Sequence, residues 1–326
     1  MNDGARIDVI DVGHGSSVAV HADGATLLID VGPGGALLEY LRTEQIRAID
    51  TILISHADAD HIGGLSAILA QRIPIGRIIW NGDSLKDTAL WTDLIYQLHD
   101  LDSAGIVAAQ ENAYAGQEIA LGASVKVLVL APNLILRKLG AGSTDRDGRR
   151  ITSNTVSVVA QVMIGGEPLM IVPGDLDAVG FHHLRKAYPG DQMQSRYLVL
   201  PHHGGHVGVN DTATAGVVSA LVAAVGPEMV FVSNGRSRFN NPRRVVIDAV
   251  KTAAPNSSIR CTQLSKDCAV TELLQTRVPP AYSVGWARGH SCAGTTSISA
   301  SNGIDDPLDT HDHQDFLHVS VPGRMC

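Results

Sequence analysis

The stretch TILISHADADHIGGL, residues 51–65, joins an apolar run to a loop dense in histidine and aspartate. TILIS is short and rich in β-branched residues, which predicts a buried strand. The side chains that follow it, His56, Asp58, Asp60 and His61, are therefore expected on a loop at the carboxyl end of a strand. Loops of this kind carry functional residues because a rigid scaffold positions them.

Two carboxylates and two imidazoles within six residues are poorly suited to ordinary packing. Buried carboxylates repel one another and lose their hydration, whereas a divalent cation neutralises them and accepts the imidazole nitrogens. We therefore expect His56, Asp58, Asp60 and His61 to bind metal.

Three other apolar runs stop at polar residues in the same way. LLID ends at Asp30, LMIVPGD ends at Asp175, and YLVLPHHGG contains His202 and His203. A single aspartate in such a place is more commonly a turn or a helix cap, and a histidine pair is commonly a surface feature. Four such strand ends in one chain favour a shared site.

Strand and helix patterns alternate in both halves of the chain, which favours two central sheets covered by helices over a parallel barrel. We predict an α/β fold with four layers in the order αββα. Strands are expected at ARIDVIDV and ATLLIDV, with VAVHADG as an edge hairpin, at 51–55, 77–80, 197–200 and 229–233, and within a β-rich stretch at 118–175. Helices are expected at 36–44, 65–72, 89–102, 178–187, 212–224 and 243–252.

Composition and charge exclude several classes of protein. The chain has 326 residues, 44% hydrophobic and 18% charged, so it can build a large core and is neither a disordered nor a coiled-coil protein. Its formal charge of −8 is opposite to that of a protein that coats nucleic acid by charge alone, so any phosphate binding must be local. With no signal-peptide pattern and no long apolar stretch, we expect a cytoplasmic protein without a membrane partner.

The strand ends resemble those of the metallo-β-lactamase superfamily, and within it the ComEC-type metallo-hydrolase (DNase) domain. The matching segments, which cover about residues 5–250, are IDVIDVGHGSSVAV, LLIDVG, ISHADADHIGGL, SNTVSVVAQV, MIVPGDLD, LVLPHHGG and FVSNGRSRFNNPRR. The HxDxDHxGG signature is highly specific to this branch, whereas DVGxG and HHG are supporting motifs. The resemblance implies a four-layer metallo-β-lactamase-like fold and a hydrolase with two divalent metal ions, Mn²⁺ or Zn²⁺.

Carried over residue by residue, the resemblance implies two ligand sets bridged by Asp175. The first set is His56 and Asp58, with Asn154 as a further candidate, and the second is Asp60, His61 and a histidine of the pair at 202–203. His203 is favoured over His202, and both remain candidates. The resemblance gives the catalytic role to Asp60, His61 and Asp175. Asp30 would hold a ligand in place, and His14, on the DVGHG loop, either borders the site or is an exposed turn residue.

Two departures from the family pattern bear on the chemistry. The wider superfamily has histidines where this chain has Asp58 and Asn154, so one ligand set is richer in oxygen, and we expect activity with Mn²⁺ at least equal to that with Zn²⁺. The ComEC-type pattern has Gly-His before Pro242, where this chain has Asn240 and Asn241, which leaves the general acid unassigned.

A cationic cluster surrounds this second departure in an otherwise acidic chain. Arg236, Arg238, Arg243 and Arg244 fall within nine residues, and guanidinium groups match phosphate oxygens well. We expect the first three to bind substrate phosphate, and the alternative is a solvated basic face at the start of a helix.

The expected function is that of a dinuclear metal-dependent hydrolase that cleaves phosphodiesters, with DNA as the favoured substrate and a regulatory protein as a further candidate partner. The alternatives are a small-molecule metallo-hydrolase, acting on a lactone or a small phosphodiester, and a binding module with weakened catalysis. The hydrolase domain is expected at 1–275, followed at 276–326 by a loop-like extension rich in His, Ser, Gly and Asp. The four cysteines are expected to be reduced, and a zinc site formed by Cys261, Cys268 and Cys292 is the alternative.

Overall fold

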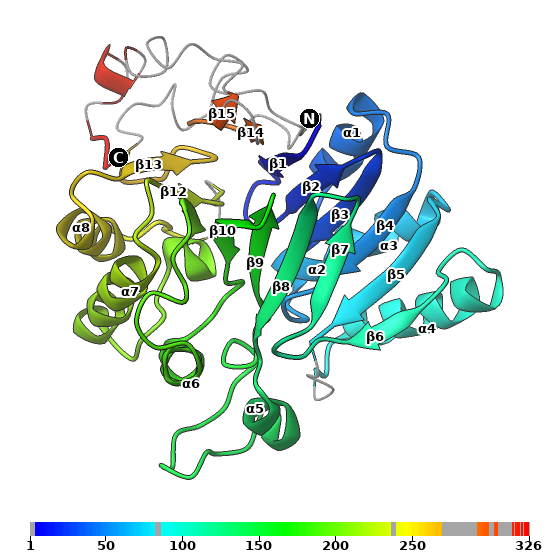
Figure 1. Ribbon diagram of the computed structural model, residues 1–326, viewed down its shortest axis with the longest axis horizontal. Helices are drawn as coiled ribbons and strands as arrows, with labels where there is room; N and C mark the ends of the chain where they lie inside the picture. Colours follow the sequence, from blue (N-terminus) through cyan, green and yellow to red (C-terminus); the bar gives the residue numbers. More distant parts are fainter. Residues whose placement is uncertain are drawn as a thin grey trace.

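The computed structural model of the chain describes residues 4–81, 86–235, 239–268 and 292–299, the backbone of 303–305, and residues 315, 317–319, 321 and 323–325. Two sheets face each other at the centre, and helices cover the outer face of each sheet (Figure 1). The predicted αββα arrangement is therefore confirmed.

The first sheet is built mainly from the N-terminal third of the chain, and its order is β15-β14-β1-β2-β3-β4-β5-β6. Its strands are β1 (Arg6–Val9), β2 (Val18–Ala22), β3 (Ala25–Ile29), β4 (Ile49–Leu53), β5 (Ile75–Trp80), β6 (Gln110–Asn112), β14 (Thr296–Ser299) and β15 (Gly303–Asp305). The strands from β3 to β6 are parallel. The helices packed on this sheet are α1 (Ala36–Thr43), α2 (Ala59–Ile62), α3 (Leu65–Ala70) and α4 (Ala89–Ser103).

The second sheet has the order β13-β12-β11-β10-β9-β8-β7, with β10 to β13 parallel. Its strands are β7 (Glu118–Leu121), β8 (Val125–Ala131), β9 (Val159–Ile164), β10 (Glu167–Val172), β11 (Tyr197–Val199), β12 (Met229–Val232) and β13 (Ser258–Cys261). The helices on its outer face are α6 (Ala178–Ala187), α7 (Asp211–Val225) and α8 (Arg244–Ala253). Two short helices, α5 (Leu134–Leu139) and the 3₁₀ helix η1 (Pro201–Gly204), lie in connections.

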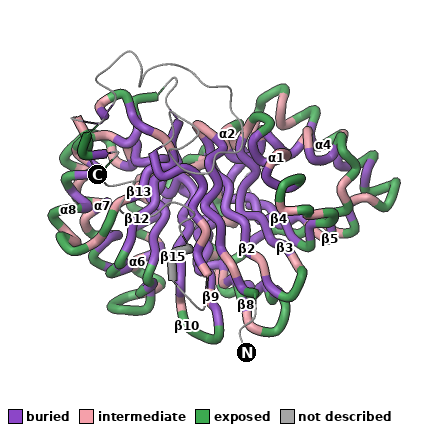
Figure 2. The backbone as a smooth tube through the Cα atoms, turned by 90° about the horizontal axis from the view of Figure 1, so that it is seen from above, coloured by how far each residue is buried: buried purple, intermediate pink, exposed green. Residues whose placement is uncertain are grey.

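Three apolar layers hold these elements together, and β3 shows how one strand serves two of them. Leu27 and Ile29 enter the core between the sheets, whereas Leu28 packs under the helices. A strand covered on both faces is apolar throughout, which explains the unbroken LLI and TILI runs of the sequence. Figure 2 shows the central strands buried and the exposed residues on the outer helices and loops.

The C-terminal extension differs in part from the expectation of a loop. Strand β14 pairs antiparallel with β1, and Ile298 is fully buried in the core between the sheets. The TSIS segment alternates buried and half-buried residues, as a strand on a sheet requires. The proposed domain boundary at residue 275 lies outside the described residues.

The parallel strands place the predicted site residues at one edge. Asp30 and His56 follow β3 and β4 of the first sheet, and Asp175 and His202 follow β10 and β11 of the second. Because carboxyl ends of parallel strands share an edge, both sheets contribute polar loops there. Within the described part of the chain, no helix combines the length and apolar character needed to cross a bilayer.

Candidate metal centre

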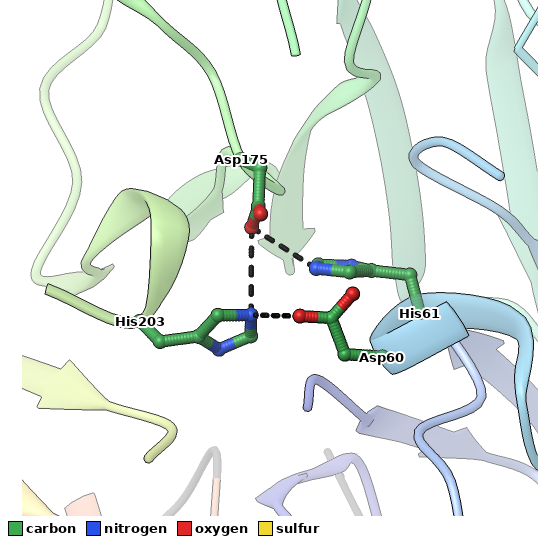
Figure 3. Close-up of side chains that lie close together, drawn as sticks. All are labelled: Asp60, His61, Asp175 and His203. Carbon is green, nitrogen blue, oxygen red and sulfur yellow. Dashed lines mark ion pairs between the residues drawn. The ribbon is translucent and has the colours of Figure 1, made fainter. Parts of the chain in front are cut away.

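Four predicted ligands converge where the two sheets meet. Asp60 and His61 lie on α2, Asp175 follows β10, and His203 lies in η1, with their ligand atoms all within 4.8 Å of one another. In Figure 3, Asp175 faces both histidines, and Asp60 faces His203.

Asp175 occupies the middle of a larger cluster because each of its oxygens faces a different pair of imidazoles. Oδ1 lies 3.0 Å from Nε2 of His61 and 3.6 Å from Nε2 of His203. Oδ2 lies 3.7 Å from Nε2 of both His56 and His202. This carboxylate is therefore placed to bridge two neighbouring ligand sets.

The remaining carboxylates are divided between the same two sets. Asp60 Oδ2 lies 3.3 Å from Nε2 of His203, and Asp58 Oδ2 lies 3.7 Å from Nε2 of His56. One set contains His56, Asp58 and His202, and the other contains Asp60, His61 and His203. Since the sequence left open which histidine of the 202–203 pair is a ligand, it is informative that both face Asp175.

The far side of each imidazole is held by a second group. Nδ1 of His61 lies 2.7 Å from Asp30 Oδ2, and Nδ1 of His56 lies 3.0 Å from Ser55 Oγ. Nδ1 of His203 donates to the Ser233 carbonyl at 2.8 Å, and Nδ1 of His202 donates to that of His206 at 2.7 Å. Second groups of this kind fix ring orientation in metal sites and leave Nε2 as the ligand atom.

The donor atoms of the cluster fit a cation. Nε2 of His56, His61 and His203 and Oδ1 of Asp175 are buried, and none makes a hydrogen bond of good geometry with a described residue; the shortest approach is the 3.0 Å between His61 Nε2 and Asp175 Oδ1. In the neutral His203 ring, Nδ1 carries the proton, so Nε2 directs a lone pair toward Asp60 and Asp175. Lone pairs and carboxylates gathered in a buried site require a cation, and this mixture of nitrogen and oxygen donors suits a divalent transition metal.

The acid–base properties of the cluster follow from the same geometry. Burial alone would raise the pKa of Asp175 and of Asp60, but the surrounding imidazoles hold both pKa values well below the usual range. Burial alone would lower the pKa of His61, yet Asp175 and Asp30 raise it. Burial and the neighbouring His61 lower the pKa of His56 to about 3. The carboxylates therefore stay ionised, as metal ligands must.

The backbone around the cluster is strained at three side-chain-bearing residues. Asp30, His202 and His203 have φ values of 61°, 53° and 55°, in the left-handed region that non-glycine residues rarely occupy. Such conformations persist where surrounding contacts impose them, commonly at functional sites. Gly174, directly before Asp175, has a φ of 54°, and a Cβ there would lie 2.7 Å from the Ser55 side chain.

An open pocket of about 400 Å³ leads to this cluster. It is lined by Asp58, Asp60, Asp175 and His202, together with His14, Ala57, Ala59, Lys86, Thr88, Leu90, Phe239 and Asn241. A substrate of moderate size can therefore reach the cluster from solvent.

His14 borders the pocket, which fits one of the two alternatives left open by the sequence. Its Nε2 lies 3.4 Å from Asp60 Oδ2, and its ring centroid lies 4.8 Å from that of His203 and 4.5 Å from that of Phe239. Nδ1 of His14 is buried without a hydrogen-bond partner among the described residues.

Lys86 is a residue of the site that the sequence did not indicate. Its ammonium group forms an ion pair with Asp58, and it lines the pocket. Burial lowers its pKa. Asp58 occupies the N-cap position of α2 without a side-chain capping bond, so its carboxylate is available to Lys86 and His56. Lys86 belongs to no recognisable motif, and only its place after β5 hints at a role.

Other predicted residues are not part of the cluster in the described structure. Asn154 has no hydrogen bond or ion pair to the ligands among the described residues, although Ser157, three positions later, lies 3.4 Å from Nδ1 of His56. Arg243 lies at the N-cap of α8, where its amide donates to the Gly204 carbonyl and its guanidinium lies 3.9 Å from Asp211. Arg236 and Arg238 lie outside the described residues.

Comparison with known proteins agrees with this geometry. The family model described as the metallo-beta-lactamase superfamily matches residues 10–172, half of the chain. The chain belongs to this superfamily. Its members are metal-dependent hydrolases, and the matched region contains Asp30, His56 and the whole of α2.

Individual relatives extend the similarity beyond that region. Competence protein ComA of Neisseria gonorrhoeae is 28% identical over 257 residues, which are 76% of this chain and 30% of that protein. ComE operon protein 3 of Bacillus subtilis (strain 168) is 20% identical over 268 residues, with the same shares. The chain thus spans about a third of the length of these relatives.

A solved structure shows the same fold. The metallo-beta-lactamase fold protein YhfI of Bacillus subtilis has a TM-score of 0.51 and 10% sequence identity, and the match covers 79% of this chain and 97% of that one.

Proposed function

We propose that this chain is a phosphodiesterase that acts on DNA with two divalent metal ions. The observation that carries the proposal is the division of six side chains into two sets around Asp175, at the base of an open pocket. When bound, the ions would supply Lewis acidity and a nucleophile at neutral pH.

The residues of the chain have distinct tasks in this proposal. His56, Asp58 and His202 would hold one ion, Asp60, His61 and His203 would hold the other, and Asp175 would contribute an oxygen to each set. Asn154 remains a candidate for the first set, because it precedes Ser157 at the edge of the cluster.

Charge near the pocket supports a phosphate-containing substrate. Lys86 lies at the pocket wall, and a guanidinium or ammonium group there can neutralise a phosphate oxygen. Arg243, Arg236 and Arg238 are proposed as further phosphate contacts. One relative is named a competence protein, and Recombination protein 2 of Haemophilus influenzae is 36% identical over 72 residues, or 20% of this chain, so DNA is the substrate that best fits these names.

A small phosphodiester or a lactone is the second candidate, favoured by the formal charge of −8. A strongly acidic protein repels a long polyanion unless local cations compensate. The two candidates differ in how DNA binding responds to salt, since several phosphate contacts make affinity fall steeply with salt.

The test is hydrolysis of linear and circular DNA with Mn²⁺, Mg²⁺, Zn²⁺ or EDTA. His61→Ala is the inactive variant, and His99→Ala, on the exposed face of α4, is the matched control. We expect cleavage by the wild type and the control, none by His61→Ala or in EDTA, and Mn²⁺ at least as effective as Zn²⁺. Two ions per chain without hydrolysis of any ester would support a binding module instead.

A further inference from the structure

Residues 132–151, which are most of the connection between β8 and β9, form an arm at the edge that carries the metal centre. Strands β8 and β10 run in the same direction, because each pairs antiparallel with β9. Ala131 pairs with Val159, and Val172 pairs with the adjacent Ala160, so β8 and β10 end at the same level. The arm, which contains α5, therefore leaves the sheet beside the loop of Asp175 and projects away from the layers in Figure 1.

Hydrogen bonds anchor the base of the arm to that loop. The hydroxyl groups of Thr152 and Thr155 donate to Asp177 Oδ2 at 2.8 Å and 2.6 Å. The amide of Asp175 donates to Ser157 Oγ at 3.2 Å. A ligand held on the arm is thus fixed relative to the proposed metal ligands.

The arm is cationic in an acidic chain. It has five basic and two acidic residues, a local charge of +3 in a protein of formal charge −8: Arg137, Lys138, Arg146, Arg149 and Arg150 against Asp145 and Asp147. Asp145 is already occupied by Arg149 and by backbone amides. Lys138 and Arg150 are exposed and have no ion pair among the described residues, and Arg146, whose Nε lies 3.8 Å from Asp147, has a side chain that is 78% exposed.

Apolar side chains accompany these charges. Leu134 and Ile135 on α5 are 65% and 55% exposed, and Tyr114, which contacts Arg137 of the same helix, is 45% exposed. The guanidinium of Arg137 lies 5.5 Å above the centre of the Tyr114 ring. Aromatic and guanidinium planes next to a cationic track form the platform on which unpaired bases stack.

We propose that the arm binds single-stranded DNA and holds it for cleavage at the metal centre, an inference that rests on the proposed function. A single strand offers both phosphates for Lys138, Arg146 and Arg150 and free base faces for Tyr114 and Leu134. A duplex offers its phosphates but shields its base faces, so it matches only the charged half of the arm.

The test compares two variants of the full-length chain with equal charge. The arm variant is Lys138→Gln/Arg146→Gln/Arg150→Gln. The control is Arg47→Gln/Arg72→Gln/Lys251→Gln. These three residues are exposed and lie before β4, before β5 and near the end of α8, at the edge of the sheets opposite to the metal centre. Binding of a fluorescein-labelled 20-nucleotide strand is measured in EDTA across a salt series, and hydrolysis of bis(p-nitrophenyl) phosphate is measured with Mn²⁺.

We expect the arm variant to bind the strand at least tenfold more weakly than the control. The slope of the logarithm of the binding constant against the logarithm of the salt concentration should be smaller in magnitude by about 2, because three single-strand phosphate contacts are lost. Tyr114→Ala should weaken single-strand binding about tenfold and duplex binding much less, and Tyr114→Phe should restore it. Hydrolysis of the small diester should stay within twofold of the wild type in every variant.

Failure of the inference is distinguishable from failure of the proposed function. Equal DNA binding by the arm variant and the control, with the small diester still hydrolysed, would overturn the inference alone. Loss of binding to anionic lipid vesicles in the arm variant, with DNA binding unchanged, would also overturn it. Arm-dependent binding of DNA without hydrolysis of any phosphodiester would support the arm and contradict the phosphodiesterase.

Discussion

Asp175 is the residue on which both ligand sets of the metal centre depend. Its two oxygens face different pairs of imidazoles, and each pair belongs to a different ligand set, so this carboxylate contacts both sets. The loss of any other ligand affects one set directly, whereas the loss of this carboxylate affects both.

Replacing Asp175 with asparagine should therefore reduce the metal content from the proposed two ions to fewer than one per chain. Activity should fall more than about 100-fold, because even outer-shell partners of metal ligands are worth 10- to 100-fold. Metal content is measured by mass spectrometry after dialysis. Asp93→Asn, exposed on α4, controls for the change in charge, and full metal content in the Asp175 variant would contradict its bridging position.

Asp30 contacts the centre only through other residues. Its buried carboxylate accepts hydrogen bonds from the amide and hydroxyl of Ser55 at 2.7 Å and 2.8 Å and holds Nδ1 of His61. Asp30→Asn should weaken metal affinity 10- to 100-fold, because Asp30 holds a metal ligand in place. It should also lower the unfolding free energy by about 1–3 kcal/mol, because one buried hydrogen-bond acceptor becomes a donor. Competition with a chromophoric chelator measures the affinity, and urea unfolding measures the stability. An unchanged affinity would show that Asp30 does not position His61.

The gathering of these residues at one edge was predictable, because strand-end polar residues in an αββα fold share an edge, whereas their roles stay predictions. What the sequence did not supply was orientation. His202 and His203 face different oxygens of Asp175 because both residues have a left-handed backbone conformation. No propensity predicts two such residues in succession. Lys86 reaches Asp58 from a segment without a motif, so only three-dimensional structure could indicate it.

At the scale of elements, a buried polar network joins α1 to the first two strands. The Tyr40 hydroxyl, on α1, donates to Asp8 of β1, and Nε2 of His21 on β2 lies 2.7 Å from that hydroxyl. Arg6 lies 3.0 Å from the same Asp8 carboxylate. Burial raises the pKa of Asp8, but His21, Arg6 and Tyr40 together hold it below the usual value.

A depressed pKa in the folded state makes this network a source of stability above the unfolded pKa of aspartate, about 3.9. Asp8→Asn should therefore lower the unfolding free energy at pH 7 by about 1–3 kcal/mol. This difference in unfolding free energy between the wild type and the variant should shrink as the pH falls through the folded pKa, because the wild-type carboxylate then takes up a proton and loses its charge. Urea unfolding from pH 7 to pH 3 measures both effects, and a deficit independent of pH would contradict the assignment.

The HADADHIGG motif ends in two glycines, and the second, Gly64, lies where α3 approaches the segment after β3 closely. The amide of Gly64, at the N-cap of α3, donates to the Val31 carbonyl, and a Cβ on Gly64 would lie 2.3 Å from the Gly32 carbonyl oxygen. Gly64→Ala should therefore destabilise the protein by about 1–3 kcal/mol through overpacking. Gly216→Ala, on α7 with no atom within 4 Å of the new Cβ, is the control. Equal thermal midpoints of the two variants would contradict the close approach.

Long helices and apolar strands were predicted nearly to the residue, as α6 at 178–187 shows, because burial patterns specify them. The stretch 118–175 was predicted only as β-rich, and the arm with α5 corrects that expectation. Six residues, LILRKL, are too few for a helical period to emerge, and the helix begins where Asn133 accepts a hydrogen bond from the Leu136 amide.

At the scale of the whole molecule, the metal centre joins the two sheets. Removal of metal should therefore lower the thermal midpoint of the entire fold. An ion present at 100 times its dissociation constant contributes about 2.7 kcal/mol, which corresponds to a shift on the order of 5 °C. Calorimetry with and without EDTA measures the shift. His61→Ala should show a smaller response to EDTA than His99→Ala, and an equal response would place the stabilising ion elsewhere.

Along the chain, the proposed ligands fall into an early group at 56–61 and a late group at 175–203. The distance between these two groups has a consequence for biosynthesis. His61 and Asp175 are more than 110 residues apart, so a ribosome releases the first group long before the second exists. An early ion would find only part of its coordination shell on a nascent chain. Metal is therefore expected to enter after both sheets have formed, through the pocket, as a maturation step. Metal-starved cells would accumulate folded, dormant protein that returns to full activity when metal is supplied, without renewed translation.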